Sequence, residues 1–295
     1  MPCYHPIDAW RSANPQDWSN GPARMVFRPE LGLPSTHVKL PCGQCIGCRL
    51  ARARTWAIRC MHESTLHAQN CFLTLTYNNE NLPPHSSLRP DDIVKFFKRL
   101  RKSGAIIRYL QCGEYGELNA RPHHHCIIFG WAPPDCVLYR AGDIPLYQSA
   151  FLSKLWPYGF VSVGSVTFDS CCYVARYVTK KVTGAKAAAY YGLRIPEYIT
   201  MSRRPGIGKA FYDEYFTDMY SHDMLVVRDK FVVKPPRYYD KLYDIDNPDK
   251  MRDIRLKRLE AVKSLPELDY KRQEVLDMCQ RLKLARNPRK MESLP

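Results

Sequence analysis

Two histidines separated by one residue and two tyrosines separated by three are the groups in this sequence best suited to chemistry. His123 and His125 lie in the run Arg121-Pro-His-His-His-Cys-Ile-Ile-Phe129, and Tyr173 and Tyr177 follow later in the chain. Residues two apart in a β-strand point to one face, so both imidazoles can bind the same metal ion. Residues four apart in a helix also share a face, so both phenols can face one cleft. A metal ion beside paired tyrosines is suited to cutting and rejoining a phosphodiester through a covalent tyrosine link.

A tyrosine needs help to attack a phosphodiester, because its phenol has an ordinary pKa of about 10. Forming the phenolate at neutral pH therefore costs roughly 4 kcal/mol. A divalent cation can polarise the phosphate, and a positive side chain near the phenol favours the phenolate. Lys180 falls on the same helix face as Tyr173 and Tyr177, and Arg176 flanks that face. The valines and alanine on the opposite arc are expected to pack against the body of the protein.

A hard divalent cation usually needs a carboxylate as well as imidazoles. Glu114 lies upstream of the histidines and can return to their face across a hairpin, whereas Glu117 is a weaker candidate. His124 lies between the paired histidines, and strand alternation points it to the opposite face. We therefore expect His123, His125 and Glu114 to form the metal site.

The composition favours a polyanionic partner. The chain has 295 residues, of which 44 are Lys or Arg and 29 are Asp or Glu, giving a net charge of +15. Nucleic acid is favoured over an anionic membrane because the sequence has no lipidation motif. No long apolar run or export signal is present, so we expect neither a membrane span nor secretion. With 45% hydrophobic residues, the chain can bury a core that holds catalytic groups rigidly.

Three of the twelve cysteines, Cys42, Cys45 and Cys48, form two C-x-x-C steps that share one residue. Without an export signal the cysteines are expected to be reduced, and this spacing suits thiolates arranged around one ion. A fourth ligand would have to come from elsewhere, and Cys3 and His5 are the nearest candidates. A structural zinc site and three unligated thiols at a helix start both remain open.

The residue pattern predicts strands alternating with helices. Helices are expected over 46–68, 90–102, 147–156 and 170–183, and strands over 71–77, 106–112, 122–129 and 159–168. Residues 113–120 are expected to form a hairpin loop or turn. This order predicts an α+β fold in which helices back an antiparallel sheet.

Three segments differ in composition. Residues 1–45 are expected to be irregular and to lead into the cysteine cluster, 46–222 to form the catalytic domain, and 223–295 to form a charged, largely helical accessory tail that binds DNA or a partner. In the helix expected over 46–68, Arg49, Arg52 and Arg59 share one arc, with Trp56 at its border. That arc is either a solvated helix face or a phosphate-contacting stripe with an aromatic side chain for base stacking.

Several motifs together resemble a known family. The runs Phe72-Leu-Thr-Leu-Thr76, Cys112-Gly-Glu-Tyr-Gly116, Arg121-Pro-His-His-His125 and Tyr173-Val-Ala-Arg-Tyr177-Val-Thr-Lys180 resemble the motif series of HUH endonucleases. With the runs starting at Cys42 and Met201, the chain is more closely similar to replication initiation proteins of gokushovirus-like microviruses, which are small single-stranded DNA phages. The resemblance covers about residues 1–222.

The resemblance implies a fold and roles for individual residues. The HUH fold is a central antiparallel sheet, ferredoxin- or RRM-like, flanked by helices. His123 and His125 would bind Mg²⁺ or Mn²⁺ with Glu114, and Tyr173 and Tyr177 would be alternating nucleophiles assisted by Lys180. The sequence departs from the family at His124, where a hydrophobic residue is usual. The basic residues expected to contact DNA are Arg49, Arg52, Arg176, Lys181, Arg203 and Arg204.

The function implied is initiation of rolling-circle replication in the cytoplasm of a bacterial host. One tyrosine would nick single-stranded origin DNA and form a 5′-phosphotyrosine, leaving a 3′-hydroxyl for a host polymerase, and the second tyrosine would end the cycle by rejoining. A host helicase would unwind the DNA, and no small-molecule cofactor is expected, although the cysteine cluster can hold Zn²⁺. The alternatives are a non-catalytic nucleic-acid-binding or packaging protein and a metal-dependent nuclease in which water attacks.

Overall fold

The computed structural model describes residues 3–18, 24–116, 119–177, 181–182, 184–228, 231–263 and 269–286, without the side chains of 176, 177, 228 and 231. The chain divides into two compact units. The first unit comprises Met1–Arg52 and Pro266–Pro288, and the second comprises Ala53–Leu265 and Arg289–Pro295. Helix α1 (Ile46–Thr65) begins in the first unit and continues into the second.

The first unit contains a small antiparallel sheet in the order β2-β1-β3, made of β1 (Ile7–Arg11), β2 (Met25–Val26) and β3 (Val38–Leu40). Helix α9 (Tyr270–Arg286) belongs to the same unit. The N-terminal segment is therefore more ordered than expected. Its strands have two to five residues and are separated by segments that contain prolines, so they are too short for their periodicity to be recognised.

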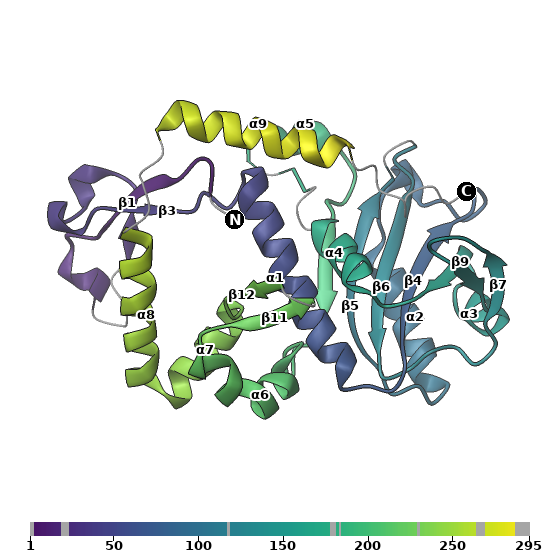
Figure 1. The fold of residues 1–295 in the computed structure, drawn as a ribbon. Coiled ribbons are helices and arrows are strands. Elements are labelled where there is room, and N and C mark those ends of the chain that lie inside the picture. The colour runs from purple at the N-terminus through teal and green to yellow at the C-terminus, as the bar shows by residue number, and fades with distance from the viewer. Residues whose placement is uncertain are drawn as a thin grey trace. The chain divides into compact units, whose positions relative to one another are not determined.

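The second unit is built on an antiparallel sheet with the strand order β10-β5-β6-β4-β9-β8-β7 (Figure 1). The strands are rich in β-branched and aromatic residues, which fit a pleated surface. Their bounds are β4 (Asn70–Tyr77), β5 (Arg108–Tyr115), β6 (Pro122–Phe129), β7 (Val137–Arg140), β8 (Leu146–Gln148), β9 (Gly159–Gly164) and β10 (Tyr198–Met201). The central strands β4 and β6 are largely buried on both faces, because helices cover each side.

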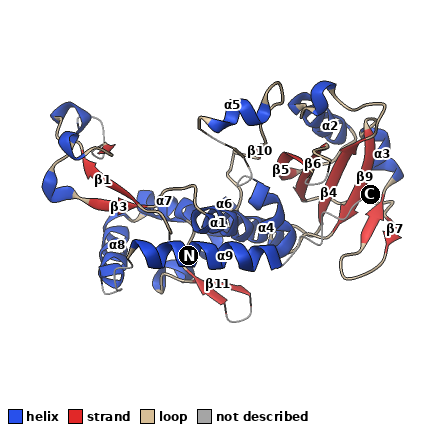
Figure 2. Ribbon diagram, turned by 90° about the horizontal axis from the view of Figure 1, so that it is seen from above, coloured by secondary structure: helices blue, strands red, loops and turns tan. Residues whose placement is uncertain are grey.

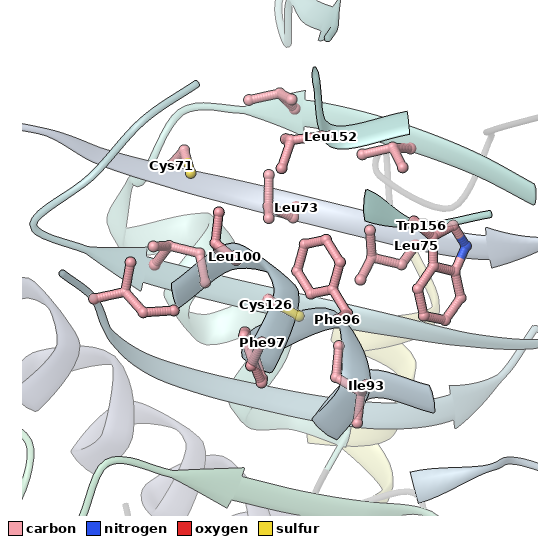
Figure 3. Packing of buried hydrophobic residues seen from close by; sticks show 14 of the residues in the cluster. Cys71, Leu73, Leu75, Ile93, Phe96, Phe97, Leu100, Cys126, Leu152 and Trp156 are labelled. Atoms are coloured by element: carbon pink, nitrogen blue, oxygen red, sulfur yellow. The ribbon is translucent and has the colours of Figure 1, made fainter. Parts of the chain in front are cut away.

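One face of the sheet packs against α2 (Pro90–Lys102) and α3 (Ala150–Leu155). Figure 3 shows Phe96 and Leu100 of α2 lying over Leu73 and Leu75 of β4. Helix α2 begins with a proline followed by two acidic residues and ends just before Gly104, which has a φ of +94°. Proline in the first turn and a glycine in the left-handed region at the end are favourable helix limits, and both were recognisable in the sequence.

The opposite face packs against the later part of α1 and against α4 (Phe168–Tyr177). Figure 2 shows α2 and α3 on one side of the strands and α4 on the other. The backbone N–H of Thr167 donates to the Ser170 hydroxyl at 2.8 Å, and the Ser170 N–H donates to the Thr167 hydroxyl at 3.1 Å. This reciprocal pair satisfies N–H groups at the start of α4 and fixes where the helix begins.

Most of the remainder of the second unit packs in a largely aromatic cluster around the later part of α1 that includes Ile58, Tyr212, Tyr239, Tyr243 and Met251. Its elements are α6 (Lys209–Ser221), β11 (Leu225–Arg228), β12 (Phe231–Val233), α7 (Arg237–Asp246) and α8 (Pro248–Lys263). Helix α5 (Lys186–Tyr191) instead places Tyr191 in a separate small cluster with Leu88 and Tyr115. The chain after residue 222 thus contributes buried side chains as well as charged helices.

The α+β fold with a central antiparallel sheet and flanking helices is confirmed. The hairpin loop predicted over 113–120 begins later than expected, because β5 continues to Tyr115 and so includes Glu114. Within the described ranges, no helix is long and apolar enough to cross a membrane.

Candidate active site

Strand register places the proposed metal ligands together. On β6, His123 lies opposite Glu114 of β5, and His125 lies opposite Thr74 of β4. Directly opposed residues in an antiparallel pair project from the same face, so all four side chains lie on one side of the sheet. This is the face covered by α4.

The three candidate ligands converge on one point. The Nε2 atom of His123 lies 2.6 Å from Oε1 of Glu114, and Nε2 of His125 lies 2.9 Å from the same oxygen. The two imidazole rings are nearly perpendicular, with 4.8 Å between their centroids. One ligand atom from each residue lies within 4.8 Å of the others, so the group can hold a metal ion. Two imidazole nitrogens and one carboxylate oxygen are suitable ligands for a divalent cation.

The second nitrogen of each ring is held by a neighbouring group. Nδ1 of His123 lies 3.0 Å from the carbonyl oxygen of Arg121, which can only accept a hydrogen bond. In the neutral ring this contact puts the proton on Nδ1 and leaves the Nε2 lone pair for an ion. Nδ1 of His125 lies 3.0 Å from the Thr74 hydroxyl, which can accept in the same way. Such contacts fix the orientation and tautomer of metal-binding histidines.

Burial and charge act in opposite directions on the Glu114 carboxyl. Glu114 is 1% exposed, and this burial acts to raise its pKa, but His123 and then His125 favour the carboxylate, so the pKa is lowered overall. An ionised, buried carboxylate facing two imidazoles attracts a cation. His123 is the most open of the three, with a side chain that is 14% exposed, so it lies on the side from which a substrate can approach.

His124 occupies the other face of the sheet. Its ring is fully buried and lies 5.8 Å from that of Trp156 and 6.2 Å from that of Tyr77, measured between centroids. Burial, with smaller contributions from the two neighbouring imidazoles, lowers the pKa of His124 to about 3. The ring is therefore neutral and packs as a core residue. It takes the place of the hydrophobic residue that is usual at this position in the family that the chain resembles.

Tyr173 lies beside the histidine pair. Its ring meets that of His125 edge to face, with centroids 5.0 Å apart, and also contacts Phe72. Its side chain is only 6% exposed, so Tyr173 is more enclosed than a residue facing a cleft was expected to be. The reason is that Tyr173 packs with Cys171 and Val174 in the apolar cluster beneath α4.

The second tyrosine and its cations are less completely described. Tyr177 is the last residue of α4, but its side chain and that of Arg176 lie outside the described part of the structure. Lys180 and Glu117 also lie outside the described residues. The relation of these four side chains to the metal ligands remains a prediction.

The other basic residues predicted to contact DNA lie in separate parts of the chain. Arg49 and Arg52 lie on the first turns of α1 in the first unit, where Arg52 contacts the backbone of Gly43. In the second unit, Lys181, Arg203 and Arg204 are exposed. Arg203 and Arg204 follow β10, whose end adjoins the start of β5 and not the end that carries Glu114. Contact of all five residues with DNA stays a prediction.

Arg59 is not part of a phosphate-contacting stripe. It is 8% exposed, and its Nε donates to the carbonyl oxygen of Ile207 at 3.0 Å. Its guanidinium carbon lies 4.2 Å from the ring centroid of Trp56 and 4.0 Å from that of Tyr238. Both arginine and tryptophan are thus used in packing, because Tyr238 of α7 packs on this part of the arc.

The cysteine cluster gains a fourth member. The sulfur atoms of Cys3, Cys42, Cys45 and Cys48 all lie within 4.8 Å of one another. His5, the other candidate, instead lies 3.6 Å from Asp277. Burial acts to raise the pKa of the Cys45 thiol, but hydrogen bonds from the backbone of Cys48 and Tyr4 help to lower it to about 6.

Two residues of the site were not singled out in the sequence. Thr74 supports His125, and Arg121 supports His123 through its carbonyl group while its own side chain donates to the carbonyl of Tyr77 at 2.8 Å. Thr74 was recognisable in principle, because it is a polar residue in the middle of a largely apolar strand. Every residue has a backbone carbonyl, so the role of the Arg121 carbonyl cannot be recognised from residue types.

Comparison with known proteins supports the resemblance. The family model described as replication-associated protein ORF2/G2P matches residues 70–182. The chain is 33% identical over 250 residues to replication-associated protein VP4 of Bdellovibrio phage phiMH2K, covering 80% of this chain and 78% of that protein. It is 36% identical over 219 residues to replication-associated protein ORF2 of Spiroplasma virus 4, covering 68% and 67%. It is also 38% identical over 153 residues to replication-associated protein ORF4 of Chlamydia phage 1, covering 48% and 38%.

No solved structure matches the chain. The two longer matches extend over most of both proteins, and the family model covers the segment that carries the histidine pair and Tyr173. The chain therefore belongs to the family of phage replication-associated proteins and is a replication initiator of the microvirus type.

Proposed function

We propose that this protein initiates rolling-circle replication by nicking and rejoining single-stranded origin DNA through a 5′-phosphotyrosine. The observation that carries the proposal is the position of Tyr173 against His125, whose Nε2 shares the Glu114 carboxylate with His123. A nucleophile and a cation site side by side are what attack on a phosphodiester requires.

Glu114, His123 and His125 would hold Mg²⁺ or Mn²⁺, and the donor set fits such an ion. The bound ion would withdraw charge from the scissile phosphate and so make the phosphorus easier to attack. The protein's own contribution is to keep the three donors in place through the backbone of Arg121 and the hydroxyl of Thr74. The thiol cluster has no part in this step, because soft sulfur ligands do not suit Mg²⁺.

Cleavage exchanges one ester for another. The Tyr173 oxygen forms a bond to phosphorus while the bond from phosphorus to the 3′ oxygen breaks. The phenol proton leaves to water, and the released 3′ oxygen takes up a proton. Because the product is a phosphotyrosine ester of similar energy, rejoining by the 3′-hydroxyl needs no nucleotide triphosphate.

The second tyrosine would complete the cycle. Tyr177 follows Tyr173 by one helical turn, so the two residues can act alternately without release of the DNA. Lys180 would favour the phenolate form of either residue. Strand separation and synthesis would come from a host helicase and polymerase in the cytoplasm of the infected cell.

A covalent-adduct assay tests the proposal. The chain is incubated with a single-stranded origin oligonucleotide labelled at its 3′ end and with Mn²⁺, and then denatured. We expect a labelled protein–DNA adduct that disappears in the Tyr173→Phe, Tyr177→Phe double variant while DNA binding is retained. Tyr139→Phe is a matched control, because Tyr139 is 48% exposed on β7 and away from the ligands.

Each alternative predicts a different product. A hydrolytic nuclease would release labelled fragments without an adduct, and a packaging protein would retain DNA without cutting it. Normal nicking by the double-tyrosine variant would show that the nucleophile is wrongly assigned. Loss of nicking in a folded His123→Ala, His125→Ala variant would support the metal site.

A further inference from the structure

Four cysteines of the first unit are arranged as ligands of a single ion. Cys42, Cys45 and Cys48 lie at the start of α1, and Cys3 reaches them from the beginning of the chain. The sulfur of Cys3 lies 3.5 Å from that of Cys42 and 3.8 Å from that of Cys45. A tetrahedral Zn²⁺ with bonds of about 2.3 Å requires sulfur atoms about 3.8 Å apart. The cluster therefore has the dimensions of a zinc tetrathiolate.

Backbone N–H groups surround the sulfurs. The Cys42 N–H points at Cys3 at 3.2 Å, and the Cys45 N–H points at Cys42 at 3.3 Å. The N–H groups of Gln44 and Tyr4 lie 3.4 Å from Cys42 and Cys45, respectively. Such donors stabilise thiolates, which carry negative charge, more than neutral thiols. Gly43, with a φ of +72°, allows the tight turn that aims these groups at the sulfurs.

Other arrangements of the same cysteines fit less well. A sulfur separation of 3.5 Å is far longer than a disulfide bond of about 2.05 Å. An iron–sulfur cubane places each thiolate on a different iron, which needs a wider spacing than sulfurs that all lie within 4.8 Å. Four ligands from the protein also leave no open position for a substrate, which is typical of structural zinc sites and not of catalytic ones.

We propose that Cys3, Cys42, Cys45 and Cys48 bind one structural Zn²⁺ that fastens the start of the chain to the start of α1. Cys3 and Cys42 are 39 residues apart, and strands β1, β2 and β3 all lie between them. A metal link across this interval lowers the entropy of the unfolded segment, and the effect grows with the length of the closed loop. The zinc thereby stabilises a sheet whose strands are too short to be stable alone.

Metal analysis of the full chain tests this site. The protein is purified without chelator, under reducing conditions with Zn²⁺ in the growth medium, and its metal content is measured by mass spectrometry. We expect one zinc per chain, at least a tenfold loss of bound zinc in Cys42→Ser and Cys3→Ser, and full retention in Cys136→Ser. Cys136 is an exposed cysteine of the second unit and serves as the matched control.

A second readout does not depend on zinc retention during purification. Co²⁺ added to the reduced, metal-free chain should give the thiolate-to-cobalt charge-transfer absorption of a tetrahedral site, and Cys42→Ser should abolish it. Removal of zinc should also make residues 3–52 cleavable by trypsin under conditions in which the second unit stays intact.

The proposal is overturned if the folded chain binds neither Zn²⁺ nor Co²⁺, if iron is found in place of zinc, or if Cys3→Ser and Cys42→Ser retain the metal. The outcome is independent of the nicking reaction. A His123→Ala, His125→Ala variant should lose nicking and keep its zinc, so failure of either proposal can be recognised separately.

Discussion

Tyr173 meets His125 edge to face across the boundary between α4 and the sheet, with 5.0 Å between the two ring centroids. More than forty residues separate His125 from Tyr173 in the sequence, yet the contact between strand and helix sets the relation between a candidate nucleophile and a candidate metal ligand. The position of Tyr173 in turn depends on the apolar packing of α4, so the geometry of the candidate site and the packing of the core are linked in this protein.

Thr74 should control how well His125 binds a metal. Thr74→Val keeps the shape of the side chain but removes the hydroxyl that lies 3.0 Å from Nδ1. We expect the Mn²⁺ concentration needed for half-maximal nicking to rise about 10- to 100-fold, because such partners orient the ring. The maximal rate should be largely restored at saturating Mn²⁺, and Thr74→Ser should behave like the wild type. An unchanged Mn²⁺ dependence in Thr74→Val would mean that the hydroxyl does not position His125.

Replacing Glu114 should weaken metal binding more strongly. Glu114→Gln keeps the size of the buried side chain and removes the charge that faces His123 and His125. The loss of Mn²⁺ affinity should exceed the roughly 100-fold upper range for supporting residues. Calorimetric titration of Mn²⁺ measures it, with the exposed Glu80→Gln as a control for the change in net charge. Equal affinities in Glu114→Gln and Glu80→Gln would exclude Glu114 as a ligand.

Burial of His62 should make the second unit sensitive to acid. The ring stacks on Phe211 and contacts the Tyr239 hydroxyl at 3.0 Å, and burial lowers its pKa to about 4. Between pH 6.5, the ordinary pKa of histidine, and pH 4, His62 is mostly protonated in the unfolded chain but mostly neutral in the folded protein. Stability is therefore unaffected above that pH, falls as the pH drops towards 4, and then changes no further through this group.

The acid sensitivity can be measured by difference. Between pH 7 and pH 5, the free energy of unfolding of the wild type should fall by about 2 kcal/mol more than that of His62→Gln. Urea titrations at both pH values test this, and His85→Gln, an exposed histidine, should follow the wild type. An equal loss of unfolding free energy in the wild type and in His62→Gln would show that His62 is not the source of the acid sensitivity.

Arg59 should be needed for stability and not for DNA binding. Arg59→Met removes the donor to Ile207 and the guanidinium held between Trp56 and Tyr238. We expect a loss of about 1–3 kcal/mol in the free energy of unfolding. Arg59→Lys should not restore it, because an ammonium group cannot stack in the same way. The salt dependence of DNA binding should be unchanged, and a reduced dependence would show that Arg59 contacts phosphate.

Arg203 and Arg204 should be needed for DNA binding and not for stability, since both side chains are exposed. If each neutralises one phosphate of single-stranded DNA, Arg203→Ala and Arg204→Ala should each reduce the slope of log affinity against log salt concentration by about 0.7. Stability should be unaffected. Lys98→Ala, on the exposed side of α2, is a control for loss of one positive charge away from β10. Equal slopes in all variants would remove these arginines from the DNA-binding surface.

The sequence was most informative where periodicity and chemistry coincided. Alternation along 122–129 separated His123 and His125 from His124, and the structure has the same division between the two faces. The limits of α2 followed from Pro90 and Gly104, because both residues restrict the backbone directly. These features are set by residues that are close together in the sequence, so the local residue pattern is enough to predict them.

Features that depend on distant partners were not predictable in this way. Arg59 shares a helical arc with Arg52, but only Arg59 is covered, because Tyr238 of α7 packs on it from almost 180 residues away. Strand β10 pairs with β5 after an interval of more than eighty residues, and its four residues carry no strong alternation. The candidates for a fourth ligand of the cysteine cluster could be narrowed to Cys3 and His5, but neither could be chosen, since composition does not show how the chain folds back.

The pairing of Glu114 with His123 has a further consequence for how this protein can change during evolution. The carboxylate and the imidazole are brought together by register alone, because residues 114 and 123 face each other across β5 and β6. Deleting one residue between these positions and the far end of either strand would put the carboxylate and the imidazole on opposite faces of the sheet. Residues inserted beyond Gly116, whose N–H still bonds to the Arg121 carbonyl, would leave the pairing intact. The turn can therefore vary in length among descendants, whereas the strands on either side of it cannot.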